Sequence, residues 1–146
     1  MKKFAIGLLA ALALAGVNAA ASEWLTDLPK AQAKAKEEKK MVLLDFTGSD
    51  WCGWCIKLHK EVFSMPEFAE YAKKNLVLVE VDFPNKKKQS AELKKANDAL
   101  QKKYSIEGYP TIIVLNGEGK KIGKLGYMPG GPKAFIAELE KVKPKA

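Results

Sequence analysis

The stretch "SDWCGWCIKLH", residues 49–59, contains both cysteines of the 146-residue chain and its only histidine. It follows "MVLLDF" (41–46), a short and mostly apolar run that is typical of a strand buried on both faces. We expect a helix to begin at the cysteines and to run to about Phe63. The start of a helix offers unpaired N–H groups and a positive dipole end, which stabilise a thiolate and lower its pKa. We therefore predict that Cys52 is an exposed, reactive thiol.

Cys55 lies almost one helical turn after Cys52, close enough to form a disulfide with it and to release a mixed disulfide. A purely structural bridge is disfavoured, because a loop of about four residues contributes only about 2 kcal/mol in the chain-entropy model. Structural zinc needs four ligands, and covalent haem needs C-x-x-C-H, whereas position 56 is Ile. A copper site that uses Cys52, Cys55 and His59 stays open as an alternative, but we predict no metal.

The remaining segments alternate between helix and strand patterns. Asp27 is suited to cap the helix expected over 24–40, and Ser64 is suited to cap the helix expected over 64–75. Helices are expected over 24–40, 64–75, 90–104 and 131–143, and strands over 76–83, 111–116 and 120–127. A strand–helix–strand crossover gives two parallel strands, and a terminal hairpin adds antiparallel ones. The fold class is therefore α/β, with a mixed central sheet of about four strands and helices on both faces.

The N-terminal segment "MKKFAIGLLAALALAGVNAAAS" has the pattern of a secretory signal peptide. Two lysines precede an apolar run that is too short for an ordinary membrane span, and small residues close it. We predict a signal peptide over 1–21, removed after Ala19 or Ala21, and one domain over 22–146. An uncleaved anchor is the alternative. Cleavage predicts a periplasmic or otherwise exported protein with no stable membrane insertion.

Composition and charge exclude several classes of protein. The chain is 47% hydrophobic and 29% charged, which is ordinary for a globular domain. Its formal net charge is +8, but the lysines are spread along the whole chain instead of forming one basic stripe with aromatic residues. Solvated faces explain them better than a nucleic-acid groove does. We expect no nucleic-acid partner, and a monomer.

Three motifs in order, "VLLDF…WCGWC…GYPT", resemble the thioredoxin superfamily from about Trp24 to Lys141. Within it, "GSDWCGWC" and the leader resemble small exported thioredoxin-like proteins. They also resemble the C-terminal thioredoxin-like domain of bacterial envelope thiol:disulfide interchange reductases. The resemblance implies a thioredoxin-like fold and a thiol–disulfide oxidoreductase whose redox-active disulfide replaces any cofactor. Its partners would be protein disulfide or dithiol substrates and an upstream thiol donor.

The resemblance also implies roles for individual residues. Cys52 would attack the substrate disulfide, and Cys55 would resolve the mixed disulfide. Pro110 would follow a cis peptide bond, beside which the backbone of Tyr109 pairs with an extended substrate. The other implied residues are Trp51, Gly53 and Trp54 as substrate contacts, with Asp45 and His59 as groups that tune the thiol pKa values or relay a proton.

Some residues depart from the thioredoxin pattern. Gly53–Trp54 stands where thioredoxins carry Gly-Pro, and one extra residue separates Asp45 from the motif. The lysine that accompanies the buried acid in thioredoxin is not evident in "LVLVEVDF" (76–83). Because Trp54 brings no charge beside the thiols, we predict a mild reductant. Two alternatives stay open: an oxidase or isomerase, and a peptide-holding chaperone or metal-delivery module on the same fold.

Overall fold

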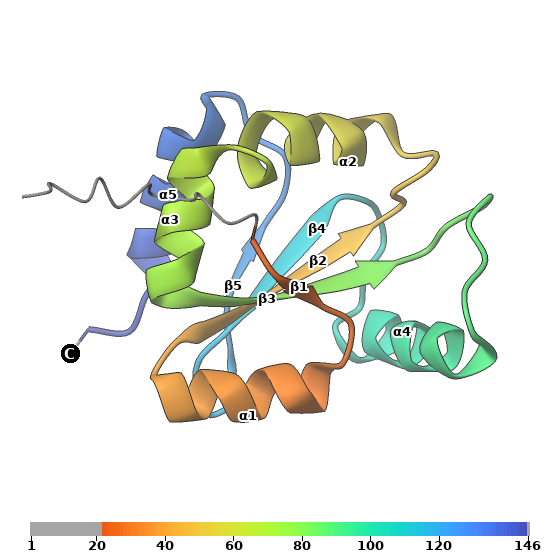
Figure 1. Ribbon diagram of the computed structural model, residues 1–146, viewed down its shortest axis with the longest axis horizontal. Coiled ribbons are helices and arrows are strands. Elements are labelled where there is room, and N and C mark those ends of the chain that lie inside the picture. Colours follow the sequence, from red (N-terminus) through yellow and green to blue (C-terminus); the bar gives the residue numbers. More distant parts are fainter. Residues whose placement is uncertain (1–21, 146) are drawn as a thin grey trace, which may run out of the picture.

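A central sheet of five strands forms the middle layer of the computed structural model, which describes residues 22–145 (Figure 1). The strand order is β1-β3-β2-β4-β5. Strands β1, β3 and β2 are parallel to one another, whereas β4 runs antiparallel to both β2 and β5. The strands are β1 (Trp24–Leu25), β2 (Met41–Thr47), β3 (Leu76–Asp82), β4 (Thr111–Leu115) and β5 (Lys121–Leu125).

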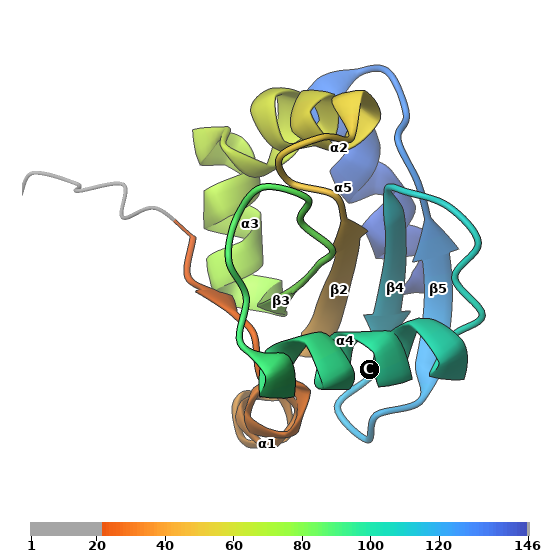
Figure 2. The same cartoon turned by 90° about the vertical axis from the view of Figure 1, so that its right-hand side faces the viewer.

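Helices cover both faces of this sheet. They are α1 (Leu28–Glu38), α2 (Gly53–Leu58), which continues into the π-helical turn η1 (His59–Phe63), α3 (Pro66–Asn75), α4 (Ala91–Lys103) and α5 (Gly131–Val142). Helices α2, α3 and α5 lie on one face of the sheet, and α1 and α4 lie on the other (Figure 2). Side chains of α2, η1, α3 and α5 share one apolar cluster with the sheet, and those of α1 and α4 pack in the second cluster. The α/β mixed-sheet prediction is confirmed.

The structure corrects the strand count and one helix start. The predicted helix over 24–40 begins later, because Trp24–Leu25 pairs with Leu78–Val79 as a fifth, two-residue strand. Asp27 caps α1 as expected, since its carboxylate accepts the N–H of Lys30 at 3.0 Å. The Ser64 prediction is wrong: Met65 occupies the N-cap position of α3, and the Ser64 hydroxyl donates to Lys60 O instead.

The predicted signal peptide, 1–21, lies outside the described residues. Within residues 22–145, no helix combines the length and the apolar character that crossing a membrane requires. The single domain predicted over 22–146 stays a prediction.

The fold brings the motifs to one edge of the sheet. The parallel strands β2 and β3 both end there, and β4, which is antiparallel to them, begins there. The loop from Thr47 to Gly53 therefore meets the loop before Thr111. The rings of Phe63, Phe68 and Phe135 pack against one another and so join η1, α3 and α5. They belong to the apolar cluster on the face of the sheet that α2 covers.

Candidate active site

Cys52 is the N-cap residue of α2, so the chain enters the helix at the first cysteine of the motif. Its sulfur accepts a hydrogen bond from the backbone N–H of Cys55 at 3.2 Å. The two cysteines form a disulfide, with their Cα atoms 5.2 Å apart. An N-cap side chain faces the free N–H groups of the first helical turn, so negative charge on Cys52 Sγ is stabilised there. The predicted pairing is confirmed.

The expectation of an exposed Cys52 is wrong for the oxidised protein. Cys52 is 7% exposed and Cys55 is 4% exposed. The reason is local: the Cys52 side chain folds back over the first turn of α2 and bonds to Cys55 instead of extending into solvent. The neighbouring indoles are open, with Trp51 45% and Trp54 57% exposed. A reacting partner must therefore approach a recessed sulfur between two exposed aromatic side chains.

The Tyr109–Pro110 peptide bond is cis, as the resemblance implies. Two hydrogen bonds hold the segment around it: Thr111 Oγ1 donates to Gly108 O at 2.7 Å, and Gln101 Nε2 donates to Tyr109 Oη at 2.6 Å. A side chain on Gly126 would contact Pro110 O, so the chain after β5 passes close to the cis bond. This arrangement leaves the loop before β4 fixed beside α2.

Trp51 is held in place by the loop that follows β3. Its indole Nε1–H donates to Phe83 O at 2.7 Å, and its ring meets the Tyr109 ring edge-on at 5.8 Å between centroids. The Tyr109 ring in turn packs against the Phe83 ring, with 5.4 Å between the ring centroids. The indole lies so close to Gly48 that any side chain there would collide with it. Trp51 is therefore a fixed wall beside the disulfide.

Two carboxylates that the sequence reasoning missed lock the loop before Cys52 onto the loop after β3. Asp50 accepts three backbone N–H groups, from Asn85 at 2.9 Å, Lys86 at 2.7 Å and Lys87 at 2.8 Å. In the opposite direction, Asp82 accepts both the backbone N–H and the hydroxyl of Ser49. Charge-assisted bonds of this kind are stronger than neutral ones. The loop between β2 and α2, which contains the one extra residue relative to thioredoxin, is therefore an ordered part of the site.

Asp50→Ala is expected to raise hydrogen-exchange rates of the amides of residues 85–87 by about 10-fold or more, because those N–H groups lose their acceptor. The same amides in wild type should lose protection only in acid. Their hydrogen bonds lower the pKa of Asp50, so its contribution is present above the ordinary carboxyl pKa and disappears as the pH falls through the lower, folded value. Asp27→Ala is the control. Equal protection in wild type and Asp50→Ala contradicts the assignment.

Asp45, the predicted buried acid, lies in β2 on the face that α2 covers. Burial, followed by the charges of Glu80 and Asp82, raises the pKa of Asp45 to about 8. Its Oδ1 is buried and has no hydrogen-bond partner among the residues described. The residue aligned with Asp45 on β3 is Glu80, so a second acid stands beside it. Asp45 is therefore a neutral carboxylic acid at pH 7.

Glu80 is half-buried, and burial followed by the charge of Asp82 raises its pKa, while Lys87 and His59 act in the opposite direction. His59 is exposed at the first residue of η1. Its charge thus acts on Glu80, a residue that the sequence reasoning did not single out. A direct effect of His59 on the thiols stays a prediction.

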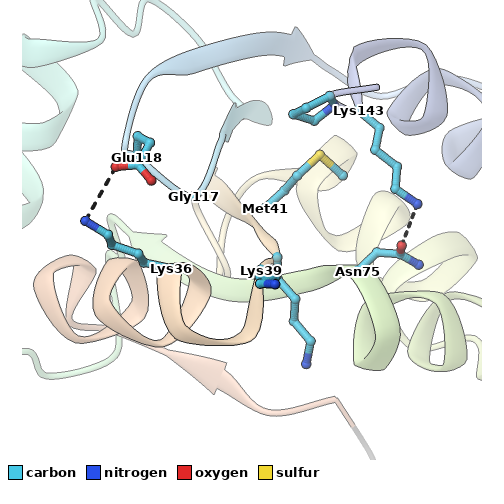
Figure 3. Close-up of a pocket in the computed structure, with 9 residues that line it drawn as sticks. Lys36, Lys39, Met41, Asn75, Gly117, Glu118 and Lys143 are labelled. Atoms are coloured by element: carbon cyan, nitrogen blue, oxygen red, sulfur yellow. Dashed lines mark hydrogen bonds and ion pairs between the residues drawn. The ribbon is translucent and has the colours of Figure 1, made fainter. Parts of the chain in front are cut away.

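The cavity shown in Figure 3 lies at the opposite edge of the sheet, near the starts of β2 and β3. Its volume is about 280 Å³, and Lys36, Lys143 and Glu118 are among its lining residues. Lys36 pairs with Glu118 at 3.5 Å, and Lys143 Nζ donates to Asn75 Oδ1 at 2.8 Å. Within the described part of the chain, no three His, Cys, Asp or Glu side chains are grouped so as to hold a metal ion.

A disulfide at a helix N-terminus, beside a cis-proline loop and above a buried acid, defines the class of thiol–disulfide oxidoreductases with a thioredoxin-like fold. A family model, thioredoxin-like domain, matches residues 28–143. The chain belongs to this family, and it carries the paired cysteines of a thiol–disulfide oxidoreductase.

Individual relatives agree with this assignment. The chain is 36% identical to the disulfide bond reductase DsbH of Chlamydia pneumoniae over 124 residues. These residues are 85% of this chain and 74% of the relative. A solved structure of a DsbH oxidoreductase superposes with a TM-score of 0.80 at 35% identity, covering 84% of this chain and 85% of that one. The thiol:disulfide interchange protein DsbD of Klebsiella pneumoniae is 33% identical over 111 residues, which are 74% of this chain and only 17% of DsbD.

Proposed function

We propose that this protein is an exported reductant of protein disulfides. The observation that carries the proposal is the Cys52–Cys55 disulfide at the start of α2, in a chain similar over most of its length to a disulfide bond reductase. The uncharged Trp54 between the cysteines agrees with a mild reductant, because it adds no cation that would further stabilise the thiolate.

Reduction proceeds by two exchanges. The Cys52 thiolate attacks one sulfur of the client disulfide, a Cys52–client bond forms as the client S–S bond breaks, and the departing client sulfur takes up a proton. Cys55 then loses its proton, and its thiolate attacks Cys52 Sγ. This step forms the Cys52–Cys55 disulfide and releases the second client sulfur, which is also protonated. Two electrons pass from the enzyme dithiol to the client.

Asp45 is suited to take the proton that Cys55 loses. With a pKa of about 8, this buried carboxyl is mostly protonated at pH 7 and loses its proton to solvent at little cost. The carboxylate that this loss leaves is the form that accepts the Cys55 proton, as expected of an acid–base group whose pKa lies near its working pH. Asp45 lies on the face of the sheet that α2 covers, and Cys55 is a buried residue of α2. The Tyr109–Pro110 segment gives the client chain a backbone to pair with beside Cys52.

The proposal includes a place and partners. The predicted signal peptide 1–21 directs the chain to the periplasm or another exported location, where an upstream dithiol donor regenerates the reduced form. The clients are protein disulfides, and the cysteines carry the electrons without a bound cofactor.

The Cys52–Cys55 reduction potential tests the direction of electron flow. A dithiothreitol or glutathione titration, followed by alkylation of free thiols, is expected to give a reduction potential of about −270 mV, as for thioredoxin. A potential of about −120 mV, as for a strong disulfide oxidant, contradicts the reductant assignment and favours an oxidase.

A further inference from the structure

Trp54 is 57% exposed, yet three residues from two parts of the chain hold its ring in place. The indole packs against Tyr127 at 4.9 Å between centroids. Lys57 Nζ lies 5.1 Å from the centroids of both rings. The Tyr127 hydroxyl donates to Glu61 at 2.8 Å, and Lys57 pairs with Glu61 at 3.9 Å. We call these residues, Trp54, Lys57, Glu61 and Tyr127, the Trp54 wall.

The Trp54 wall is joined to the chain after β5 through Tyr127, whereas Trp51 is joined to the loop after β3 through Phe83. Trp54 lies between the two cysteines in sequence, and Tyr127 follows Gly126, which approaches Pro110 O. Trp51 is pinned in its turn to Phe83 and Tyr109. Both indoles are exposed and belong to residues that adjoin Cys52 or lie between the cysteines in sequence, so the side chains that flank a client cysteine are expected to contact them. Because both rings are fixed before binding, they offer apolar area without an ordering cost.

Exposed lysines lie beyond both indoles. Lys57 Nζ lies over the Trp54 and Tyr127 rings, and the Asp50 hydrogen bonds place the backbone of Lys86 and Lys87, which Lys88 follows, beside the loop that carries Trp51. Three nearby acids have partners within the protein: Asp50 binds backbone N–H groups, Glu61 binds Tyr127 and Lys57, and Asp82 binds Ser49 and Lys87. Lys86 and Lys88 form no ion pair with a described carboxylate, so the surface around the disulfide has an apolar centre and two unpaired ammonium groups at one margin.

We propose that this surface selects extended client segments that carry a bulky apolar residue next to the reacting cysteine and carboxylates farther along the chain. The inference rests on the proposed function and specifies its substrate class. Partly burying one large side chain against an indole is worth about 1.4 kcal/mol, or about 10-fold in kcat/KM. Charge complementarity at an exposed margin adds a smaller factor, about 5-fold at low salt.

Three peptides test the preference, each carrying one cysteine in a mixed disulfide with the same chromogenic thiol, so that the leaving group is constant. The first has Trp beside the cysteine and flanking Glu, the second Ser and Glu, and the third Trp and Lys. The reduced full-length mature protein is expected to prefer the first over the second by about 10-fold in kcat/KM. It should prefer the first over the third by about 5-fold, and 0.5 M salt should remove most of that second ratio.

Matched variants separate the two contributions. Trp54→Ala should lower the Trp-to-Ser ratio from about 10-fold to about 3-fold, since Trp51 remains, whereas Met65→Ala, which removes another exposed apolar side chain, should preserve it. Lys86→Gln combined with Lys88→Gln spares Lys87, which pairs with Asp82, and should remove the acidic preference. The matched control is Lys120→Gln with Lys121→Gln, at the opposite edge of the sheet.

The possible failures are distinguishable. If wild type reduces all three peptides with ratios below 2-fold, the substrate preference is wrong and the oxidoreductase function stands. If no peptide is reduced although the dithiol is intact, the proposed function itself fails. Sedimentation should show a monomer. A dimer that Trp54→Ala dissociates would assign the surface to a second copy of the chain and overturn the client assignment.

Discussion

Cys52→Ser is expected to lose essentially all disulfide-reducing activity, a fall of about 1000-fold or more in insulin reduction with dithiothreitol. The serine hydroxyl is not ionised at neutral pH and cannot form a disulfide with the client. The remaining thiol cannot substitute for it, because Cys55 lies within the first turn of α2 and not at the N-cap, where the free helix N–H groups stabilise a thiolate. The two cysteines therefore differ in role, because Cys52 Sγ caps α2 whereas Cys55 lies inside its first turn.

Cys55→Ser should fail at the next step and leave a visible product. Its Cys52 still attacks the client, but no second thiol is present to release the mixed disulfide. Non-reducing gels of this variant with a disulfide-bonded client should show a covalent complex that dithiothreitol dissolves, and wild type should show little of it. Equal insulin reduction by wild type and Cys52→Ser would reject the enzyme assignment and favour a binding module.

Features encoded by contiguous residues were predicted from the sequence. The spacing of Cys52 and Cys55 after a buried strand was enough to place a disulfide at a helix start. Asp27 followed by Pro29 marked the beginning of α1. The cis bond before Pro110 came from the resemblance and not from local chemistry, since Tyr109–Pro110 alone would indicate only a loop that enters a strand. Strand β1 was missed because two residues show no periodicity.

Features that join distant loops were not predicted. Asp50 binds backbone groups 35 to 37 residues away, and Tyr127 reaches Glu61 across 66 residues. Neither contact leaves a pattern in the sequence, because an acid before a tryptophan and a tyrosine after a glycine are common in loops. The recessed position of Cys52 was missed for a related reason: the exposure of an N-cap side chain depends on its χ1 angle and its neighbours, which spacing does not determine.

Asp45→Asn is expected to stabilise the oxidised protein at neutral pH, because it removes a titration that opposes folding. The pKa of Asp45 is about 8 in the folded protein, whereas the ordinary pKa of an aspartate carboxyl is 3.8. Between these values the folded state holds a proton that the unfolded state has released, so wild-type stability falls as the pH rises, by up to about 1.4 kcal/mol per pH unit. At pH 7 the variant should be more stable by up to about 4 kcal/mol. Below pH 4 this difference should disappear.

Urea denaturation at several pH values, with the disulfide intact, measures the effect. Asp27→Asn is the matched control, because asparagine caps a helix about as well as aspartate and the change lies on the surface of α1. Parallel stability curves for wild type and Asp45→Asn from pH 4 to 8 would show that Asp45 is ionised in the folded state. That outcome would contradict the raised pKa of Asp45 and the folding cost assigned to it, and the rate of client release would then decide its role as a proton acceptor.

The same substitution should slow reduction by about 10-fold to 100-fold at the step in which Cys55 displaces the client, since an amide cannot accept the thiol proton. Single-turnover release of product from the mixed disulfide isolates that step. A stability gain joined to a loss of this step means that the buried acid is kept for its chemistry, against a folding cost. A stability gain with unchanged release would leave Asp45 as a buried charge without a role in exchange, and another group would have to take the proton from Cys55.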